Sequence, residues 1–117
     1  MGFELNPTEK MASDFCDMAR RRLGNRVKDF QILDVIDDPN YRSFSVIFEA
    51  YNYFIVRMNY DRGSFGCCIS TGKHGISLPN SQQWYDKADF NVFFRELQEQ
   101  LELRIPDKFL RAHGWLK

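Results

Sequence analysis

The stretch that decides the fold is 43–69, SFSVIFEAYNYFIVRMNYDRGSFGCCI. Apolar and polar residues alternate in three successive segments of it, and turn-forming residues separate each segment from the next. Alternation with a period of two is typical of a strand that has one buried face. The sequence 61–64, DRGS, is typical of a tight hairpin turn. The stretch therefore predicts three consecutive antiparallel strands.

A fourth strand is predicted just before this stretch. The period of two begins at Val27, and 37–40, DDPN, is a strong turn signal. On strict alternation, one face of this strand carries Phe30, Ile32 and Ile36, and the other carries Leu33 and Val35. The four segments together predict a four-stranded antiparallel meander.

A helix is predicted ahead of the strands. Asn6 is a good N-cap, Pro7 suits the first helical position, and Glu9 occupies the capping-box position. Apolar residues then recur at helical spacing as far as Leu23, and 24–25, GN, ends the helix.

Two helices are predicted after the strands. Asp86 or Asp89 is expected to cap the first of them, and Ile76–Leu78 before it is a candidate edge strand. The apolar stripe of this first helix consists of Phe90, Phe93, Phe94, Leu97 and Leu101. Pro106 starts a third, short helix that ends at Gly114, with Trp115 packing back on Leu110.

The element order is thus one helix, four strands and two helices. Both main helices are amphipathic and are able to cover one face of a sheet. We therefore predict an α+β two-layer sandwich that forms a single domain over 1–117: an N-terminal helix, a four-stranded antiparallel meander and two C-terminal helices. The second face of the sheet is expected to stay partly open.

Length and composition argue against several classes of protein. The chain has 117 residues, and sixteen basic residues balance sixteen acidic ones. This neutrality argues against a nucleic-acid partner, because nucleic-acid binders usually carry a basic excess. We find neither a signal-peptide pattern nor an apolar run of the roughly 20 residues that a membrane span needs. We therefore expect a cytoplasmic protein with no membrane partner and with its three cysteines as thiols.

The sequence contains no specific catalytic or metal-binding motif. The cysteines and the two histidines lack zinc-site spacing, and no nucleophile signature surrounds Cys67 or Cys68. We predict no catalytic residue, no metal site and no cofactor.

Two charged clusters have structural interpretations. Asp34, Asp37 and Asp38 form an acidic cluster, but their position before 39–40, PN, favours a turn. Arg20–Arg22 occupy the last turn of the first helix, where a solvated helix end is favoured over a phosphate site.

The open sheet face is the first candidate binding surface. Strict alternation places on it Leu33, Val35, Ile47, Tyr53, Ile55, Arg57 and Cys68, with Ser43, Ser45 and Glu49 beside them. Aliphatic, aromatic and arginine residues within a polar rim are typical of a protein interface. The sequence leaves three alternatives for what covers this face: a partner protein, a second copy in a homodimer, or the C-terminal segment. That segment contains Phe109, Leu110, Trp115 and Leu116.

The segment before the second helix is the other candidate. Trp84, Tyr85 and Asp86 combine large aromatic rings with polar groups, as interface anchors do. Alternatively, Trp84 packs inward as a hydrophobic staple at the start of the helix. The predicted partner-binding residues are therefore Ile47, Tyr53, Ile55, Arg57, Trp84, Tyr85 and Asp86.

The chain resembles a known class of protein in its layout and in its ending, 104–110, RIPDKFL, followed by 113–115, HGW. Bacterial immunity proteins of polymorphic toxin systems, including contact-dependent growth inhibition, are similar small α+β proteins. The resemblance implies tight binding to one cognate toxin, and it assigns no role to any individual residue. The neutral charge fits mixed apolar and polar contacts better than mimicry of a nucleic acid.

We therefore expect a non-enzymatic protein-binding module, specifically an immunity protein that neutralises a toxin. The alternative is a small enzyme or ligand-binding domain with a pocket between sheet and helices. The helix-facing strand residues are almost all apolar, which favours the binding module, because an active site there would need polar groups.

Overall fold

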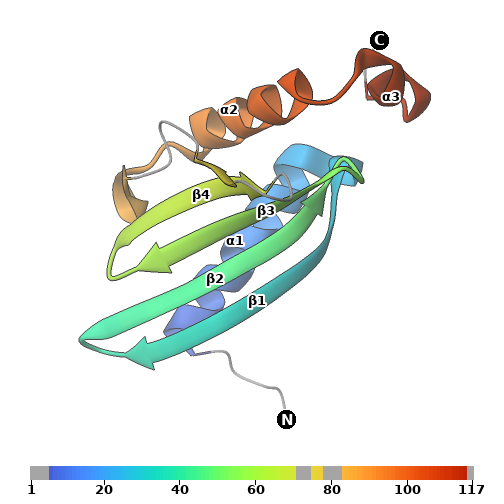
Figure 1. Ribbon diagram of the computed structural model, residues 1–117. Coiled ribbons are helices and arrows are strands. Elements are labelled where there is room, and N and C mark those ends of the chain that lie inside the picture. Colours follow the sequence, from blue (N-terminus) through green and yellow to red (C-terminus); the bar gives the residue numbers. More distant parts are fainter. Residues whose placement is uncertain (1–5, 71–74, 78–82, 116–117) are drawn as a thin grey trace.

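The computed structural model describes residues 6–70, 75–77 and 83–115 and shows an α+β fold built on one antiparallel sheet (Figure 1). The helices are α1 (Pro7–Leu23), α2 (Phe90–Leu103) and α3 (Asp107–Ala112). The strands are β1 (Val27–Asp38), β2 (Tyr41–Ala50), β3 (Phe54–Asp61), β4 (Ser64–Ser70), β5 (Gly75–Ser77) and β6 (Gln83–Trp84). Short 3-10 turns occupy Gly24–Arg26 and Tyr85–Lys87. The predicted meander and the three predicted helices are confirmed.

The sheet follows the chain order β1-β2-β3-β4-β5, and every neighbouring pair is antiparallel. The predicted hairpin turn between β3 and β4 has positive φ at Arg62 and Gly63, as a tight two-residue turn requires. The predicted edge strand is β5, and Leu78 lies outside the described residues. β6 also pairs with β4 and was not predicted, because two residues are too few to show alternation.

The start of α1 has the predicted chemistry. Asn6 accepts a hydrogen bond from the Glu9 amide, and the Glu9 side chain accepts one from the Asn6 amide, which completes the capping box. Thr8 then ties the helix to the sheet, because its hydroxyl donates to Asp37 at 2.7 Å and its amide donates to the same oxygen at 3.2 Å. This contact joins the first turn of α1 to the end of β1.

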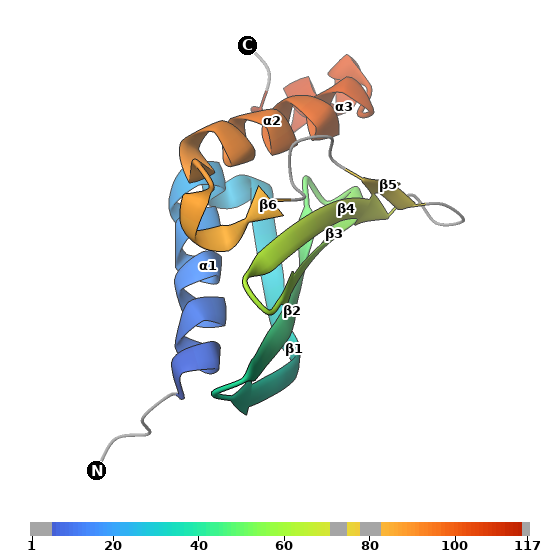
Figure 2. The same ribbon diagram turned by 90° about the vertical axis from the view of Figure 1, so that its left-hand side faces the viewer.

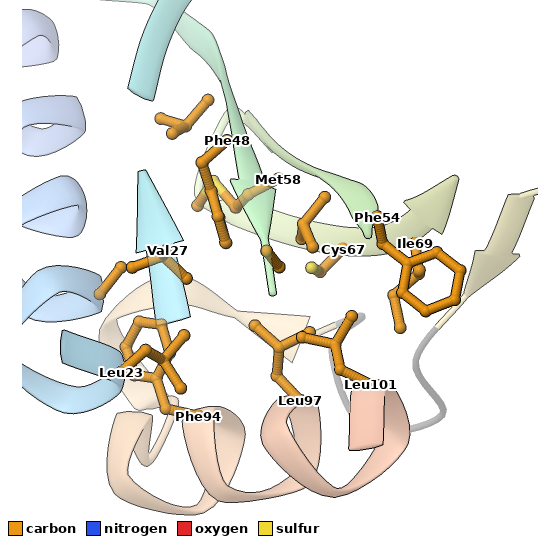
Figure 3. Close-up of a cluster of buried hydrophobic side chains, with 14 of the residues drawn as sticks. Leu23, Val27, Phe48, Phe54, Met58, Cys67, Ile69, Phe94, Leu97 and Leu101 are labelled. Carbon is orange, nitrogen blue, oxygen red and sulfur yellow. The ribbon is translucent and has the colours of Figure 1, made fainter. Parts of the chain in front are cut away.

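The helices lie on one side of the sheet (Figures 1 and 2). Figure 3 shows apolar side chains of β2, β3 and β4 pointing toward those of α2. Phe48, Val56, Met58 and Ile69 on the sheet are fully buried, as are Leu97 and Leu101 on α2. Among the described residues, apolar side chains of the sheet and of α2 therefore pack against each other on the covered face.

The C-terminal segment packs at the end of the helical layer. Asp89 caps α2 by accepting from the Asn91 and Val92 amides. The chain after α3 folds back at the predicted glycine, since Gly114 has φ +76° and the Trp115 amide donates to the Leu110 carbonyl at 2.9 Å. Leu110 is buried in the core, and the Trp115 ring lies against Tyr51. The described part of this segment therefore contributes to the covered side of the sheet, and Leu116 lies outside the described residues.

Two β-bulges in β1 overturn part of the predicted alternation. The register to β2 shifts between Lys28 and Gln31 and again between Leu33 and Ile36. An aspartate with positive φ lies in each shift, Asp29 at +59° and Asp34 at +54°. The extra residue reverses the faces of the residues that follow it. Val35 packs against the core and Ile36 faces solvent with Leu33, so the prediction for Val35 and Ile36 was wrong.

Candidate functional site: the open sheet face

The strand register defines the face of the sheet that is turned away from the helices. Directly opposite residues on antiparallel strands point to the same side. Gln31 pairs with Ile47, Ile47 with Arg57, and Arg57 with Cys68. Each such set of paired residues forms a row across the strands, and the other rows are assigned to a face in the same way. We use the term open face for the central residues of these rows, which are Gln31, Leu33, Ile36, Ser43, Ser45, Ile47, Glu49, Ile55, Arg57, Asn59 and Cys68, together with the Asp34 carboxylate that reaches Arg57.

The centre of the open face is a polar network around Arg57. Its Nε donates to Asn59 Oδ1 at 3.0 Å, and its Nη2 donates to Ser45 Oγ at 3.2 Å. The same Nη2 lies 3.4 Å from Asp34 Oδ2 in an ion pair. The Ser45 hydroxyl donates to Asn59 Oδ1 at 2.7 Å and is nearly buried. Residues from β1, β2 and β3 therefore orient the Arg57 guanidinium, whose side chain stays 42% exposed.

The bulge in β1 supplies the carboxylate of this network. Asp34 adopts a left-handed conformation, which aspartate tolerates better than most residues. Sequence reasoning placed Asp34 in an acidic cluster with Asp37 and Asp38, but the structure separates the three. Asp37 binds Thr8 and Arg42, and Asp38 accepts from the Asn40 amide in the turn. The turn interpretation therefore holds for Asp38, whereas Asp34 belongs to the open face.

Aliphatic side chains surround the polar network. Ile36 is 46% exposed and Ile55 is 44% exposed, while Leu33 and Ile47 are half-buried. Ile47 lies directly opposite Arg57, and Ile55 lies opposite Glu49. The open face therefore offers apolar contacts on either side of an oriented arginine.

Tyr53 does not lie among the open-face residues. It belongs to the turn between β2 and β3, where Tyr51 and Asn52 both have positive φ. The Tyr53 ring packs edge-on against Phe54 and Phe109. Strict alternation failed here because a turn with left-handed residues does not preserve the two-residue period. The ring is still 47% exposed, so it remains accessible beside α3.

The other three predicted residues are separated as well. β6 places Trp84 opposite Ser64, on the side of the sheet that carries the open face, and its ring lies against Gly63. Trp84 is 57% exposed and is therefore not a buried staple. Tyr85 turns inward against Phe65 and Phe90 instead, and burial raises its pKa to about 12. Asp86 is exposed in the following 3-10 turn.

The hairpin end of the open face carries a further contact that sequence reasoning missed. The Arg62 guanidinium lies over the Tyr41 ring at 5.0 Å, and the Arg62 amide donates to the Arg42 carbonyl. Tyr41 and Arg62 come from different hairpins, so only their paired strands reveal that they are neighbours. Together with Trp84 they give this end of the sheet exposed aromatic surface.

The cysteines and the histidine of the described residues are dispersed. All three cysteines are thiols; Cys67 is buried on the covered face, and Cys68 lies on the open face opposite Arg57. Burial raises the pKa of Cys16 and of Cys67. The His113 ring stacks on Trp115 beside α3. Within residues 6–70, 75–77 and 83–115, no group of three or more His, Cys, Asp or Glu side chains is placed to hold a metal ion.

Hydrogen bonding, charge pairing and apolar contact are what the open face offers chemically. None of the helices in the described ranges is both long enough and apolar enough to cross a bilayer. Comparisons of the chain with protein-family models, with curated proteins and with solved structures found no match.

Proposed function

We propose that this chain is a protein-binding module that uses its open face to contact a partner protein. The observation that carries the proposal is the hydrogen-bonded Arg57 guanidinium, with Ile47 directly opposite it and the exposed Ile55 beside it on β3. Arginine is enriched among the residues that dominate binding energy, and holding its side chain in place before binding lowers the entropy cost. The helices of the described residues leave this face open to a partner (Figure 2).

The partner that we propose is a cognate toxin, which this chain would neutralise as an immunity protein. The support is the layout of one helix, a meander and two helices, which is the layout on which the resemblance to immunity proteins rests. The formal net charge of +0 is consistent with a mixed apolar and polar contact.

The experiment compares the wild-type chain with Ile55→Lys. Lysine is suited to this position because Glu49 lies directly opposite, so the variant should keep its fold. The matched control is Leu103→Lys, because Leu103 is 76% exposed at the end of α2, away from the open face. Proteins captured by the wild-type chain are purified and titrated by calorimetry against all three chains.

We expect one captured protein to bind in a stoichiometric complex and to lose at least about a hundredfold in affinity with Ile55→Lys, but not with Leu103→Lys. Expression of that protein alone should arrest cell growth, and co-expression of the wild-type chain should restore it. Equal binding by all three chains would place the contact elsewhere and overturn the proposal. A wild-type dimer that Ile55→Lys converts to a monomer would overturn it in favour of a second copy.

A further inference from the structure

The groove between α1 and α2 lies in the helical layer, apart from the open face. It has a volume of about 300 Å³ and is formed by the last two turns of α1 and the first turns of α2. Met18, Phe90 and Phe94 contribute its apolar surface, and Arg21, Arg22 and Asn91 complete its lining. A second groove of about 360 Å³ continues along α2 as far as Arg95 and Gln98, and it shares Arg22, Asn91 and Phe94 with the first.

Among the described residues, the arginines of these grooves lack the ion pairs that four of the other seven arginines make. Arg20, Arg42, Arg57 and Arg62 each pair with an aspartate. In the described part of the chain, by contrast, Arg21, Arg22 and Arg95 have no carboxylate partner. Arg21 donates to the Asp17 carbonyl, and Arg22 donates to the side chain and the carbonyl of Asn91. Their positive charge is therefore not neutralised at the grooves.

The one carboxylate that lines either groove offsets only part of this charge, because three arginines face it. Asp89 lines the second groove, but its Oδ1 accepts from the Asn91 and Val92 amides as the cap of α2. The helix N-terminus that it caps adds a positive partial charge of its own. The paired grooves are thus apolar at the base and cationic at the rim, although the chain as a whole is neutral.

We propose that these paired grooves bind an acidic segment of a partner protein, with an apolar side chain seated on Met18, Phe90 and Phe94. Carboxylates on the segment would meet Arg21, Arg22 and Arg95, which present planar donors suited to carboxylate oxygens. The apolar base favours a peptide over a nucleic-acid backbone, which would use the arginines but not the methionine and phenylalanine surface. This site is independent of the open face, so either proposal stands if the other fails.

The probe is a fluorescein-labelled peptide in which glutamate alternates with leucine and phenylalanine. Two control peptides replace each glutamate by glutamine or each apolar residue by serine. We expect saturable binding by fluorescence anisotropy for the first peptide only, and weaker binding as salt is added. In the complex, the methyl resonance of Met18 should shift, whereas that of Met58, which is buried under the sheet, should not.

The test variant is Arg21→Glu with Arg95→Glu, two exposed residues on the α1 and α2 sides of the grooves. The matched control is Lys108→Glu with Arg111→Glu, which makes the same change in charge on exposed residues of α3. We expect the test variant to lose at least about tenfold in affinity and the control to stay within about twofold. Should the glutamate variant unfold early, glutamine at both positions removes the charge without reversing it.

Four results would overturn the proposal. Equal binding of the serine-substituted peptide would show that charge alone is recognised. An equal loss of affinity in the α3 control variant would show that the peptide responds to the overall charge of the protein and not to the grooves. Binding of a labelled oligothymidylate but not of the peptide would assign the grooves to nucleic acid. Self-association that the test variant abolishes would assign them to a second copy of this chain.

Discussion

Val56 and Ile55 are neighbours in β3, yet they lie on opposite faces of the sheet. Val56 is fully buried beneath the helices, whereas Ile55 is 44% exposed. On the covered face, the neighbours of Val56 are apolar and are packed against α1 and α2. On the open face, the residues next to Ile55 are Glu49 and Ser70, and the row beyond them contains Arg57.

This difference shows which residues the fold requires. The covered face is stabilised by removing apolar surface from water, so its residues are constrained by size and hydrophobicity. The open face carries a hydrogen-bonded arginine and exposed isoleucines, neither of which the core needs. Residues that folding does not require are free to serve binding, which is why we place the binding function on that face.

The largest expected effect comes from placing the same substitution on each face. Val56→Lys should unfold the protein or cost roughly 4 kcal/mol or more, because it puts an unpaired ammonium among apolar side chains. Ile55→Lys should change the free energy of unfolding by less than about 1 kcal/mol, since its side chain reaches solvent and faces Glu49. Urea unfolding followed by circular dichroism measures both. Similar losses for the two variants would show that the assignment of faces is wrong.

A smaller effect is expected at the bulge that builds the open face. Asp34→Val should lower the free energy of unfolding by about 1–3 kcal/mol, because a β-branched residue is strained at φ +54°. Asp34→Gly should stay within about 1 kcal/mol of the wild type, since glycine accepts this φ and an exposed ion pair contributes little. Thermal unfolding compares the three chains. If valine proves harmless, the bulge is not what turns Val35 inward.

The smallest expected effect concerns the Asp37 carboxylate at the end of β1. Its pKa is lowered, first by the hydrogen bond from the Thr8 hydroxyl and then by the Thr8 amide and Arg42. A carboxyl whose folded pKa is lowered stabilises the fold above its unfolded pKa, and this stabilisation disappears as pH falls through the folded value.

Asp37→Ala should therefore melt below the wild type at neutral pH, and the difference should shrink as pH falls below the ordinary carboxyl pKa of 3.8. Melting curves over the acidic range provide the measurement. A difference that is the same at every pH would mean that the charge of Asp37 does not contribute. Thr8→Ala is the companion variant, and it should reduce the pH dependence by removing the donor that holds the carboxylate.

Much of the candidate site followed from local pattern. Ile47, Ile55, Arg57 and Cys68 lie on the open face as alternation predicted, because β2, β3 and β4 pair without an interruption. The errors occurred where the backbone leaves the extended region, at Asp34 in the bulge and at Tyr51 and Asn52 in the turn. Each of these residues tolerates the extended conformation as well, so its identity alone did not reveal the change.

By itself, the sequence determined the main helices and the four long strands of this protein. The capping residues Asn6 and Asp89 begin the two main helices, and the alternation in 43–69 forms the strands that they cover. These features depend on residues within a few positions of one another, so the local sequence is enough to predict them.

Only the tertiary structure decided which residues meet across the sheet. The network of Asp34, Ser45, Arg57 and Asn59 and the arginine-rimmed grooves between α1 and α2 depend on strand register and helix packing, which bring together residues that are far apart in the chain.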